Sequence, residues 1–306
     1  MTTTHHGTAD LCRICPRQCG TERRAGKLGV CGIPDTFVVS RIAPHLWEEP
    51  PVSGKNGSGT VFFTGCNLRC VFCQNRTISR EGVGKSVTDE ELTEAILRLQ
   101  DQGVHNINFV TPTHYTHRLV RLLEAVKPRL HIPVVWNSGG YESVEALRML
   151  EGLVDVYLPD FKYMSPNLSA DYSAAPDYAD RATGAVLEMY RQIGAYEEAD
   201  GLAVKGVIVR HLVLPGCRAD SIAVMRHLAD ILPVDHIRVS VMRQYTPDFA
   251  ADCPYKNLHR RVTDFEYNSV LDEAARLGII GFSQSKEAAT KAYTPDFWGG
   301  EINLGL

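Results

Sequence analysis

Cysteine is the residue type best able to carry chemistry in this 306-residue chain, which contains nine cysteines. Seven of the nine lie within the first 73 residues and form two sets with different spacing. In a reducing compartment, clustered thiols usually bind metals or react instead of forming disulfides. The sequence has neither a signal peptide with an apolar centre nor an apolar run long enough to cross a membrane. We therefore expect a cytoplasmic protein, without membrane contact, whose clustered cysteines bind metal.

The second cysteine set has the spacing C-x3-C-x2-C and consists of Cys66, Cys70 and Cys73 in the segment GCNLRCVFCQN. Three thiolates on one short loop can hold three irons of a four-iron cluster and leave the fourth iron open to another ligand. The spacing alone also fits a zinc site or buried thiols without a metal. Its position directly after an apolar segment, followed by repeated strand and helix patterns, favours the cluster.

The first set has the spacing C-x2-C-x3-C-x11-C and consists of Cys12, Cys15, Cys19 and Cys31. Four thiolates suit either one tetrahedral zinc ion or one additional iron–sulfur cluster, and the spacing leaves both open. Five basic residues share this segment, Arg13, Arg17, Arg23, Arg24 and Lys27. Such residues lower thiolate pKa values and offset the negative charge of a metal–thiolate centre. Cys217 and Cys253 stand apart, and we expect both to be packed thiols.

The elements that position these residues follow a repeated pattern of buried strands and amphipathic helices. Six apolar segments predict strands over 60–65, 106–111, 133–138, 155–160, 204–214 and 236–242. Helical patterns follow them at 88–103, 117–128, 143–152, 181–194, 221–232 and 268–278. Nearly continuous apolar strands that alternate with helices indicate a parallel sheet covered on both faces. We predict an α/β fold, a partial TIM-type (β/α)6 barrel, with an open doubly wound sheet as the other arrangement of such units.

The composition divides the chain near residue 58. Residues 1–58 are rich in Gly, Pro and Cys, which predicts a small irregular cysteine-rich N-terminal extension, and residues 59–306 form the core domain with a C-terminal tail. The formal net charge is -4, with 44% hydrophobic residues, as in an ordinary soluble globular protein. No basic excess points to nucleic acid, so we expect none as a partner.

The cysteine loop, its place after the first strand and the six strand–helix units resemble the radical S-adenosylmethionine (SAM) enzymes. The segments SGKNGSGTVFFTGCNLRCVFCQN, YLPDFKY and RHLVLPG are similar to the pyruvate formate-lyase activating enzymes within that superfamily. The resemblance implies a [4Fe-4S] cluster on Cys66, Cys70 and Cys73, with SAM on the open iron. It places Phe72 near the SAM adenine, and it makes Gln74 a further candidate for binding the cofactor.

The resemblance further implies that one electron, from flavodoxin or ferredoxin, leads to reductive cleavage of SAM to a 5′-deoxyadenosyl radical. That radical would abstract hydrogen from a glycine of a partner glycyl radical enzyme or from a small molecule. A non-catalytic iron–sulfur or zinc protein, serving electron transfer or as a scaffold, is the alternative from another class.

Polar residues at the predicted strand ends are candidates for binding SAM, since parallel strands bring their carboxyl ends to one edge. In the radical SAM family the second strand usually ends in Gly-Gly-Glu, which contacts the SAM amino group. Here the segment is FVTPTHY, with Thr111, Thr113 and His114 in the equivalent place. Later strands contribute Asn137 and Ser138, then Asp160 and Lys162 in an Asp-x-Lys pattern similar to the activating enzymes, then Arg210 and Gln244.

Overall fold

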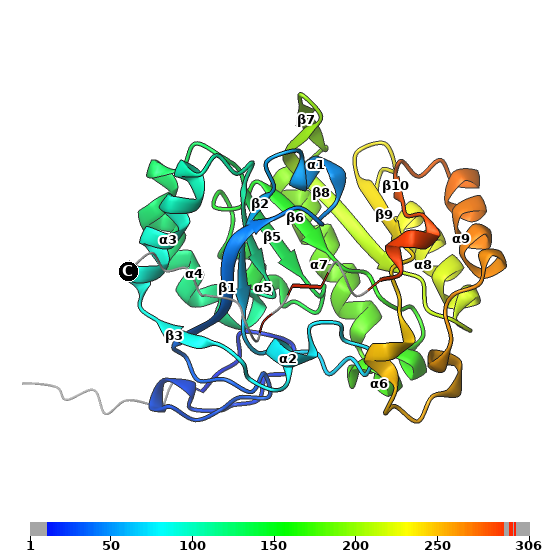
Figure 1. Cartoon of the computed structure of the whole chain (residues 1–306), viewed down its shortest axis with the longest axis horizontal. Helices are drawn as coiled ribbons and strands as arrows, with labels where there is room; N and C mark the ends of the chain where they lie inside the picture. Colours follow the sequence, from blue (N-terminus) through cyan, green and yellow to red (C-terminus); the bar gives the residue numbers. More distant parts are fainter. Residues whose placement is uncertain (1–10, 291–293, 296, 298–306) are drawn as a thin grey trace, which may run out of the picture.

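A ten-stranded sheet organises the part of the chain that the computed structural model describes, residues 11–290, 294–295 and 297 (Figure 1). The strand order is β10-β9-β8-β6-β5-β4-β2-β1-β3, and β7 pairs with β8. The pairs from β2 through β4, β5, β6, β8 and β9 to β10 are parallel, whereas β1, β3 and β7 pair antiparallel. The strands are β1 (Phe37–His45), β2 (Ser58–Phe63), β3 (Lys85–Val87), β4 (Ile107–Val110), β5 (Val134–Ser138), β6 (Val156–Pro159), β7 (Glu197–Ala199), β8 (Leu202–Leu212), β9 (Arg238–Met242) and β10 (Gly281–Ser283).

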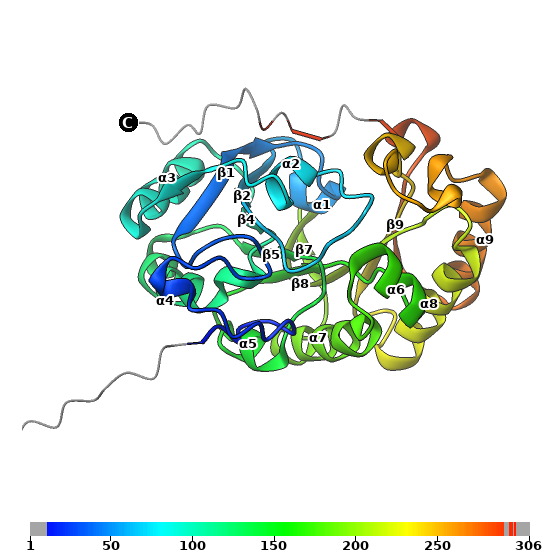
Figure 2. The ribbon, with the colours of Figure 1, turned by 90° about the horizontal axis from the view of Figure 1, so that it is seen from below.

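The helices form mainly in the connections between parallel strands. They are α1 (Pro50–Ser53), α2 (Arg76–Ser79), α3 (Asp89–Asp101), α4 (Thr116–Val126), α5 (Val144–Arg148), α6 (Pro166–Ser173), α7 (Tyr178–Ile193), α8 (Arg218–Ile231) and α9 (Asp264–Arg276). Figure 2 shows α4, α5, α7 and α8 in a row along one side of the sheet. The capping box that Thr88 and Glu91 predict at the start of α3 is present, because each side chain bonds the other's backbone N–H. The predicted α/β class and its repeated strand–helix units are confirmed.

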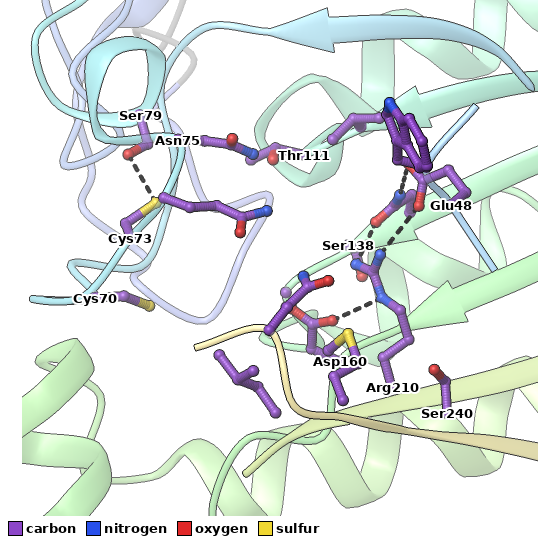
Figure 3. A pocket seen from close by; sticks show the side chains of 18 of the residues that line it. Glu48, Cys70, Cys73, Asn75, Ser79, Thr111, Ser138, Asp160, Arg210 and Ser240 are labelled. Carbon is purple, nitrogen blue, oxygen red and sulfur yellow. Dashed lines mark hydrogen bonds and ion pairs between the residues drawn. The ribbon is translucent and has the colours of Figure 1, made fainter. Parts of the chain in front are cut away.

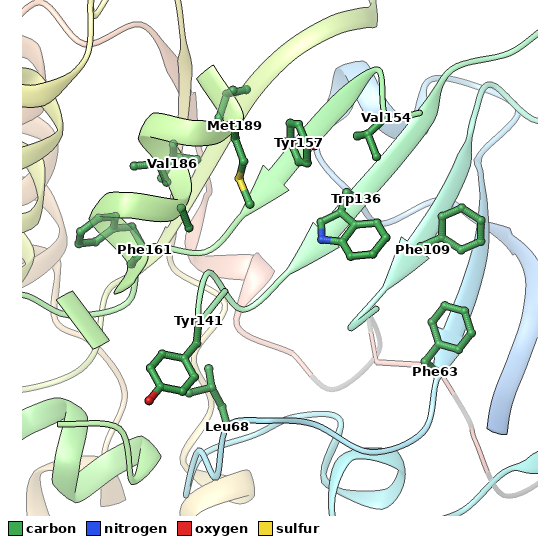
Figure 4. Packing of buried hydrophobic residues seen from close by; sticks show 14 of the residues in the cluster. Phe63, Leu68, Phe109, Trp136, Tyr141, Val154, Tyr157, Phe161, Val186 and Met189 are labelled. Atoms are coloured by element: carbon green, nitrogen blue, oxygen red, sulfur yellow. The ribbon is translucent and has the colours of Figure 1, made fainter. Parts of the chain in front are cut away.

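Alternate residues of each strand face opposite sides of the sheet, and the two sides differ in polarity. Phe63, Phe109, Trp136 and Tyr157 belong to the main apolar core, which also contains α3, α4, α7 and α8 side chains (Figure 4). The alternate residues of the same strands include Phe62, Val135 and Leu158, which form two smaller clusters. We call this second side the inner face. Polar residues are interspersed on it, and they build the candidate site.

Residues 37–57 differ from the predicted irregular extension. Residues Phe37–His45 form β1, which pairs antiparallel with β2 from Val39 opposite Phe63 to His45 opposite Ser58. Residues 11–36 are irregular apart from one short 3-10 helix, whereas residues 37–57 contain β1 and α1. β1 forms because its backbone groups pair with those of β2. The local composition of residues 37–45 does not reveal this distant partner. Within the described ranges, no helix is both long and apolar enough to cross a membrane.

Candidate active site

A cavity of about 410 Å³ opens on the inner face, at the carboxyl ends of the parallel strands (Figure 3). This volume lies within the range of small-molecule and cofactor sites. Twelve of the residues predicted from the sequence line it: Cys66, Cys70, Phe72, Cys73, Gln74, Thr111, Asn137, Ser138, Asp160, Lys162, Arg210 and Gln244. They come from the loop after β2 and from the ends of β4, β5, β6, β8 and β9. The parallel sheet therefore gathers side chains that lie up to 178 positions apart (from 66 to 244).

The three cysteines lie on the loop between β2 and α2, and polar groups contact each sulfur. The backbone N–H of Leu68 donates to Cys66 Sγ at 3.4 Å. The Cys70 and Cys73 sulfurs lie 3.0 and 3.4 Å from the hydroxyls of Ser173 and Ser79. Burial raises the pKa of the Cys66 thiol to about 12, so this thiol is neutral at physiological pH unless a metal binds. Three thiols facing one cavity, each with a hydrogen-bond partner, fit the donor set of a three-cysteine iron–sulfur cluster.

Charged side chains at the ends of β6 and β8 form a paired network beside the cysteine loop. Asp160 accepts from Lys162 and, at 2.9 Å, from Arg210 Nε. Arg210 Nη2 also donates to Asn137 Oδ1 at 2.6 Å. Burial alone would raise the pKa of Asp160, but Arg210 and Lys162 outweigh it and hold this pKa below its usual value. The network therefore keeps one carboxylate and two cations charged inside the cavity.

Backbone geometry at two of the strand ends is also specialised. Thr111, directly after β4, has a φ of 58°, in the left-handed region that side chains other than glycine seldom adopt. Its N–H donates to the Asn137 carbonyl at 2.8 Å, which fixes this turn against β5. Gly140 has a φ of 74°, and a Cβ there would lie 2.0 Å from the Asp160 carbonyl oxygen. The glycine is thus required by close packing against the chain beside Asp160, whereas its neighbour Gly139 lines the cavity.

Thr113 and His114 do not line the cavity, in contrast to the expectation that they replace Gly-Gly-Glu. Thr113 Oγ1 donates to Glu142 Oε1 at 2.8 Å, and His114 Nε2 lies 3.0 Å from the Thr64 carbonyl oxygen. Both residues are buried in the short helix after Thr111. The turn at Thr111 sends the following residues toward the main core, so only Thr111 of the three faces the cavity.

Two acidic residues that sequence reasoning missed also line the cavity, Glu48 and Glu49. They precede α1 in the segment WEEPP, which lies outside every predicted strand and helix. Glu48 accepts from Asn137 at 3.1 Å and from Arg210 at 3.3 Å. Two adjacent carboxyl groups before a Pro-Pro pair were the only local signal, and such a pair normally lies on a solvated surface.

The N-terminal cysteines form a separate group that does not line the cavity. Cys15 interacts electrostatically with Cys12 and Cys31, Cys31 with Cys12 and Cys19, and the Cys19 thiol lies within hydrogen-bonding reach of Cys12. Burial raises the pKa of Cys15 to about 11. In the described part of the chain, no three His, Cys, Asp or Glu side chains are arranged to hold a single metal ion. The four predicted ligands are therefore neighbours, and the identity of a metal on them stays a prediction.

Comparison with known proteins identifies the family. The sequence model of the radical SAM superfamily matches residues 60–216, which is 157 of 306 residues. An uncharacterized protein of Methanocaldococcus jannaschii, MJ0674, is 31% identical over 282 residues, covering 88% of this chain and 75% of that protein. The chain therefore belongs to the radical SAM superfamily, and membership implies a [4Fe-4S] cluster and SAM as cofactors.

One solved structure shows the same fold at low sequence identity, and a second is only a similar chain. SuiB of Streptococcus suis, bound to its precursor peptide SuiA, matches with a TM-score of 0.52 and 14% identity over 72% of this chain. This chain covers 46% of SuiB, less than half of that protein. A domain of a pyruvate-formate lyase-activating enzyme from Bacteroides vulgatus matches with a TM-score of 0.40 and 11% identity, over 56% of this chain and 92% of that domain.

Proposed function

We propose that the protein cleaves SAM reductively and abstracts a hydrogen atom from a substrate bound in the same cavity. One observation carries this proposal: Cys66, Cys70 and Cys73 share a cavity of about 410 Å³ with the paired charges of Asp160, Lys162 and Arg210. Thiols alone would suit an electron carrier, whereas a carrier needs no adjacent small-molecule cavity with buried charges. The arrangement is that of a site that binds a charged organic molecule next to a metal centre.

The residues of the site divide into cluster ligands and groups that bind and orient SAM. Cys66, Cys70 and Cys73 would hold the cluster, and a reduced cluster there would supply the electron for splitting SAM into methionine and a 5′-deoxyadenosyl radical. Lys162 offers an ammonium to the SAM carboxylate, and Asp160 accepts from a hydroxyl or ammonium group. Phe72 is buried between the Tyr172 and Tyr245 rings, which fixes its ring as an apolar surface for the adenine.

Gln74 and Gln244 line the same cavity, and Gln244 accepts from Gln284 of the chain after β10 at 3.1 Å. This pairing orients the Gln244 amide, so its nitrogen can donate to a bound cofactor. Asn137 and Ser138 contribute further polar atoms beside it. Flavodoxin or ferredoxin is the proposed electron donor, as the resemblance to the radical SAM enzymes implies.

Two substrate classes are proposed for the hydrogen abstraction. The first is a small molecule that shares the cavity with SAM. Activation of a glycyl radical enzyme is the second substrate class, and it follows from the sequence similarity to the activating enzymes.

The test is an anaerobic assay of the reconstituted protein with dithionite and SAM. We expect release of methionine and 5′-deoxyadenosine, detected by liquid chromatography. A protein that binds iron but releases no 5′-deoxyadenosine would contradict the proposal and support a non-catalytic iron–sulfur protein. An electron paramagnetic resonance signal of a glycyl radical, after mixing with a candidate partner enzyme, would establish the second substrate class.

A further inference from the structure

Glu48 and Glu49 form an acidic floor of the cavity, opposite the cysteine loop. They lie between β1 and α1, and β1 runs antiparallel to β2, so this segment reaches the inner face from the amino ends of the parallel strands. The cysteine loop comes from the carboxyl end of β2. Figure 3 shows Cys70 and Cys73 on one side of the cavity and Glu48 on the other, with Asp160 and Arg210 between them.

The two carboxylates of the acidic floor differ in their hydrogen bonding. Glu48 is satisfied, since Asn108, Asn137 and Arg210 all donate to it at 3.1 to 3.3 Å. Glu49 is only 7% exposed, and its Oε2 has no hydrogen-bond partner among the described residues. Its side chain does not cap α1, although Glu49 is the residue before that helix. A buried acceptor without a partner is costly, so its presence in a cavity wall indicates a ligand.

The balance of charge in the cavity gives the chemistry of that ligand. Among the described residues that line it, the carboxylates are Glu48, Glu49 and Asp160, and the cations are Lys162 and Arg210. Lys162 pairs with Asp160, and Arg210 pairs with both Asp160 and Glu48. Burial raises the pKa of Glu49, Arg210 only partly opposes this effect, and the neighbouring Glu48 adds to it. Without a ligand Glu49 therefore favours its neutral form, and a bound cation would stabilise its carboxylate.

We propose that Glu49, held beside Glu48, binds a protonated amine of the substrate, so that the substrate is a small organic ammonium compound. The proposal rests on the proposed function, because it concerns the molecule from which hydrogen is taken. Apolar residues of the same wall, such as Phe62 and Phe282, exclude water and strengthen a charge-assisted hydrogen bond to Glu49. Anchored there, the substrate extends toward the cysteine loop, which places its carbon atoms on the side where SAM binds.

The experiment measures binding of simple probes to the reconstituted, SAM-loaded protein by calorimetry and thermal shift. The probes are n-butylammonium, n-butanol and butanoate, which share a carbon chain and differ in charge. We expect n-butylammonium to bind and to raise Tm, and the other two probes to have no effect. Glu49→Gln is expected to weaken n-butylammonium binding by about tenfold or more, the loss of one charge-assisted contact. The matched control, Glu197→Gln on the exposed strand β7, is expected to bind as the wild type does.

A second variant, Glu49→Met, separates binding from folding. Because it removes a buried carboxyl group with one unpaired oxygen, we expect its Tm without ligand to equal or exceed that of the wild type, while n-butylammonium no longer binds. A large fall in Tm for both Glu49 variants would make Glu49 a structural residue and overturn the proposal. Equal binding of all three probes, or undiminished binding to Glu49→Gln, would overturn it as well.

Two further outcomes also contradict the proposal. An equal Tm shift with Na⁺ or K⁺ chloride would assign the acidic floor to an inorganic cation, and loss of SAM affinity in Glu49→Gln would assign it to the cofactor. The proposed function fails separately, if the wild type releases no 5′-deoxyadenosine. Amine binding without that release would keep the amine site and reject the radical chemistry.

Discussion

Cys66, Cys70 and Cys73 border a cavity, whereas none of Cys12, Cys15, Cys19 and Cys31 contributes to its wall. Three thiols beside open space leave one position of a cluster for a substrate or cofactor. The four thiols of the first set lie away from the cavity, and a metal on them stays a prediction. The same distinction separates catalytic from structural zinc sites. The number of cysteines and their access to the cavity thus distinguish two neighbouring regions.

The two cysteine regions are in direct contact. The backbone N–H of Cys66 donates to the Cys31 carbonyl at 3.2 Å. Arg17 donates to the Asn67 carbonyl at 2.7 Å and to the Ser173 carbonyl at 3.2 Å. The N-terminal segment therefore packs on the loop that carries Cys66, Cys70 and Cys73, and its order helps to fix that loop. This contact predicts that the first region acts on activity only through the position of the second.

The largest predicted effect separates the two cysteine sets. In Cys66→Ala we expect loss of the cluster iron and a fall of more than about 100-fold in 5′-deoxyadenosine release, because a direct ligand matters more than the outer partners that tune a metal site. If the first set holds a metal, Cys12→Ser/Cys15→Ser should lose that metal and should lower SAM cleavage only in part, through the position of the loop that carries the second set. Iron, zinc and sulfide analysis of both variants, with product quantification, checks this contrast. Equal loss of cleavage in the two variants would show that the first set is not merely structural.

The next effect concerns the buried arginine that holds the N-terminal segment. Arg23 is 2% exposed and donates to the carbonyls of His114, Pro34 and Ile33 at 2.6, 2.8 and 3.2 Å. Arg23→Met leaves these acceptors without a donor, so we expect a loss of about 3 kcal/mol in the free energy of unfolding. Urea denaturation followed by tryptophan fluorescence measures it.

The neighbouring Arg24 provides the control for Arg23, since its side chain is 55% exposed. Arg24→Met should change the free energy of unfolding by no more than about 0.5 kcal/mol. A similar result for both variants would mean that the N-terminal segment is not held by Arg23.

The smallest predicted effect is a pH dependence of the free energy of unfolding. It comes from His114, whose carbonyl accepts from Arg23 of the N-terminal segment. Burial, reinforced by Arg23, lowers the pKa of His114 to about 3. Below the pKa of about 6.5 in the unfolded chain, the unfolded state binds a proton that the folded state does not, so stability falls as pH falls from 6.5 toward 3. Between pH 7.5 and 5.5 this residue should account for about 1.4 kcal/mol of lost stability.

His114→Gln should remove that part of the pH dependence in urea unfolding at the two pH values. The exposed residue His131 offers the control, and His131→Gln should keep the wild-type difference. An unchanged pH dependence in His114→Gln would show that His114 is already protonated, or exposed, in the folded protein.

The local sequence was sufficient to predict the strands and helices whose apolar periodicity lies within one continuous segment. The period of apolar residues identified the strands β2, β4, β5, β6, β8 and β9 and the helices α3, α4, α5, α7, α8 and α9, because one face of each buries against the core. It missed the short helices α1, α2 and α6 and the strands β1, β3, β7 and β10, which join the sheet only by pairing with β2, β1, β8 and β9. Such pairing is a long-range property, and a short segment contains no record of its partner.

The sequence by itself determined the cysteine loop, since three thiols within eight residues must remain close in any fold. It also placed Asp160, Lys162 and Arg210 at one edge, because parallel strands align their carboxyl ends. Only the tertiary structure decided that Thr113 and His114 turn away and that Glu48 and Glu49 enter the cavity. Which side chain faces a cavity depends on the turn at Thr111 and on the path of the chain between β1 and α1. Both are set by packing against residues distant in the sequence.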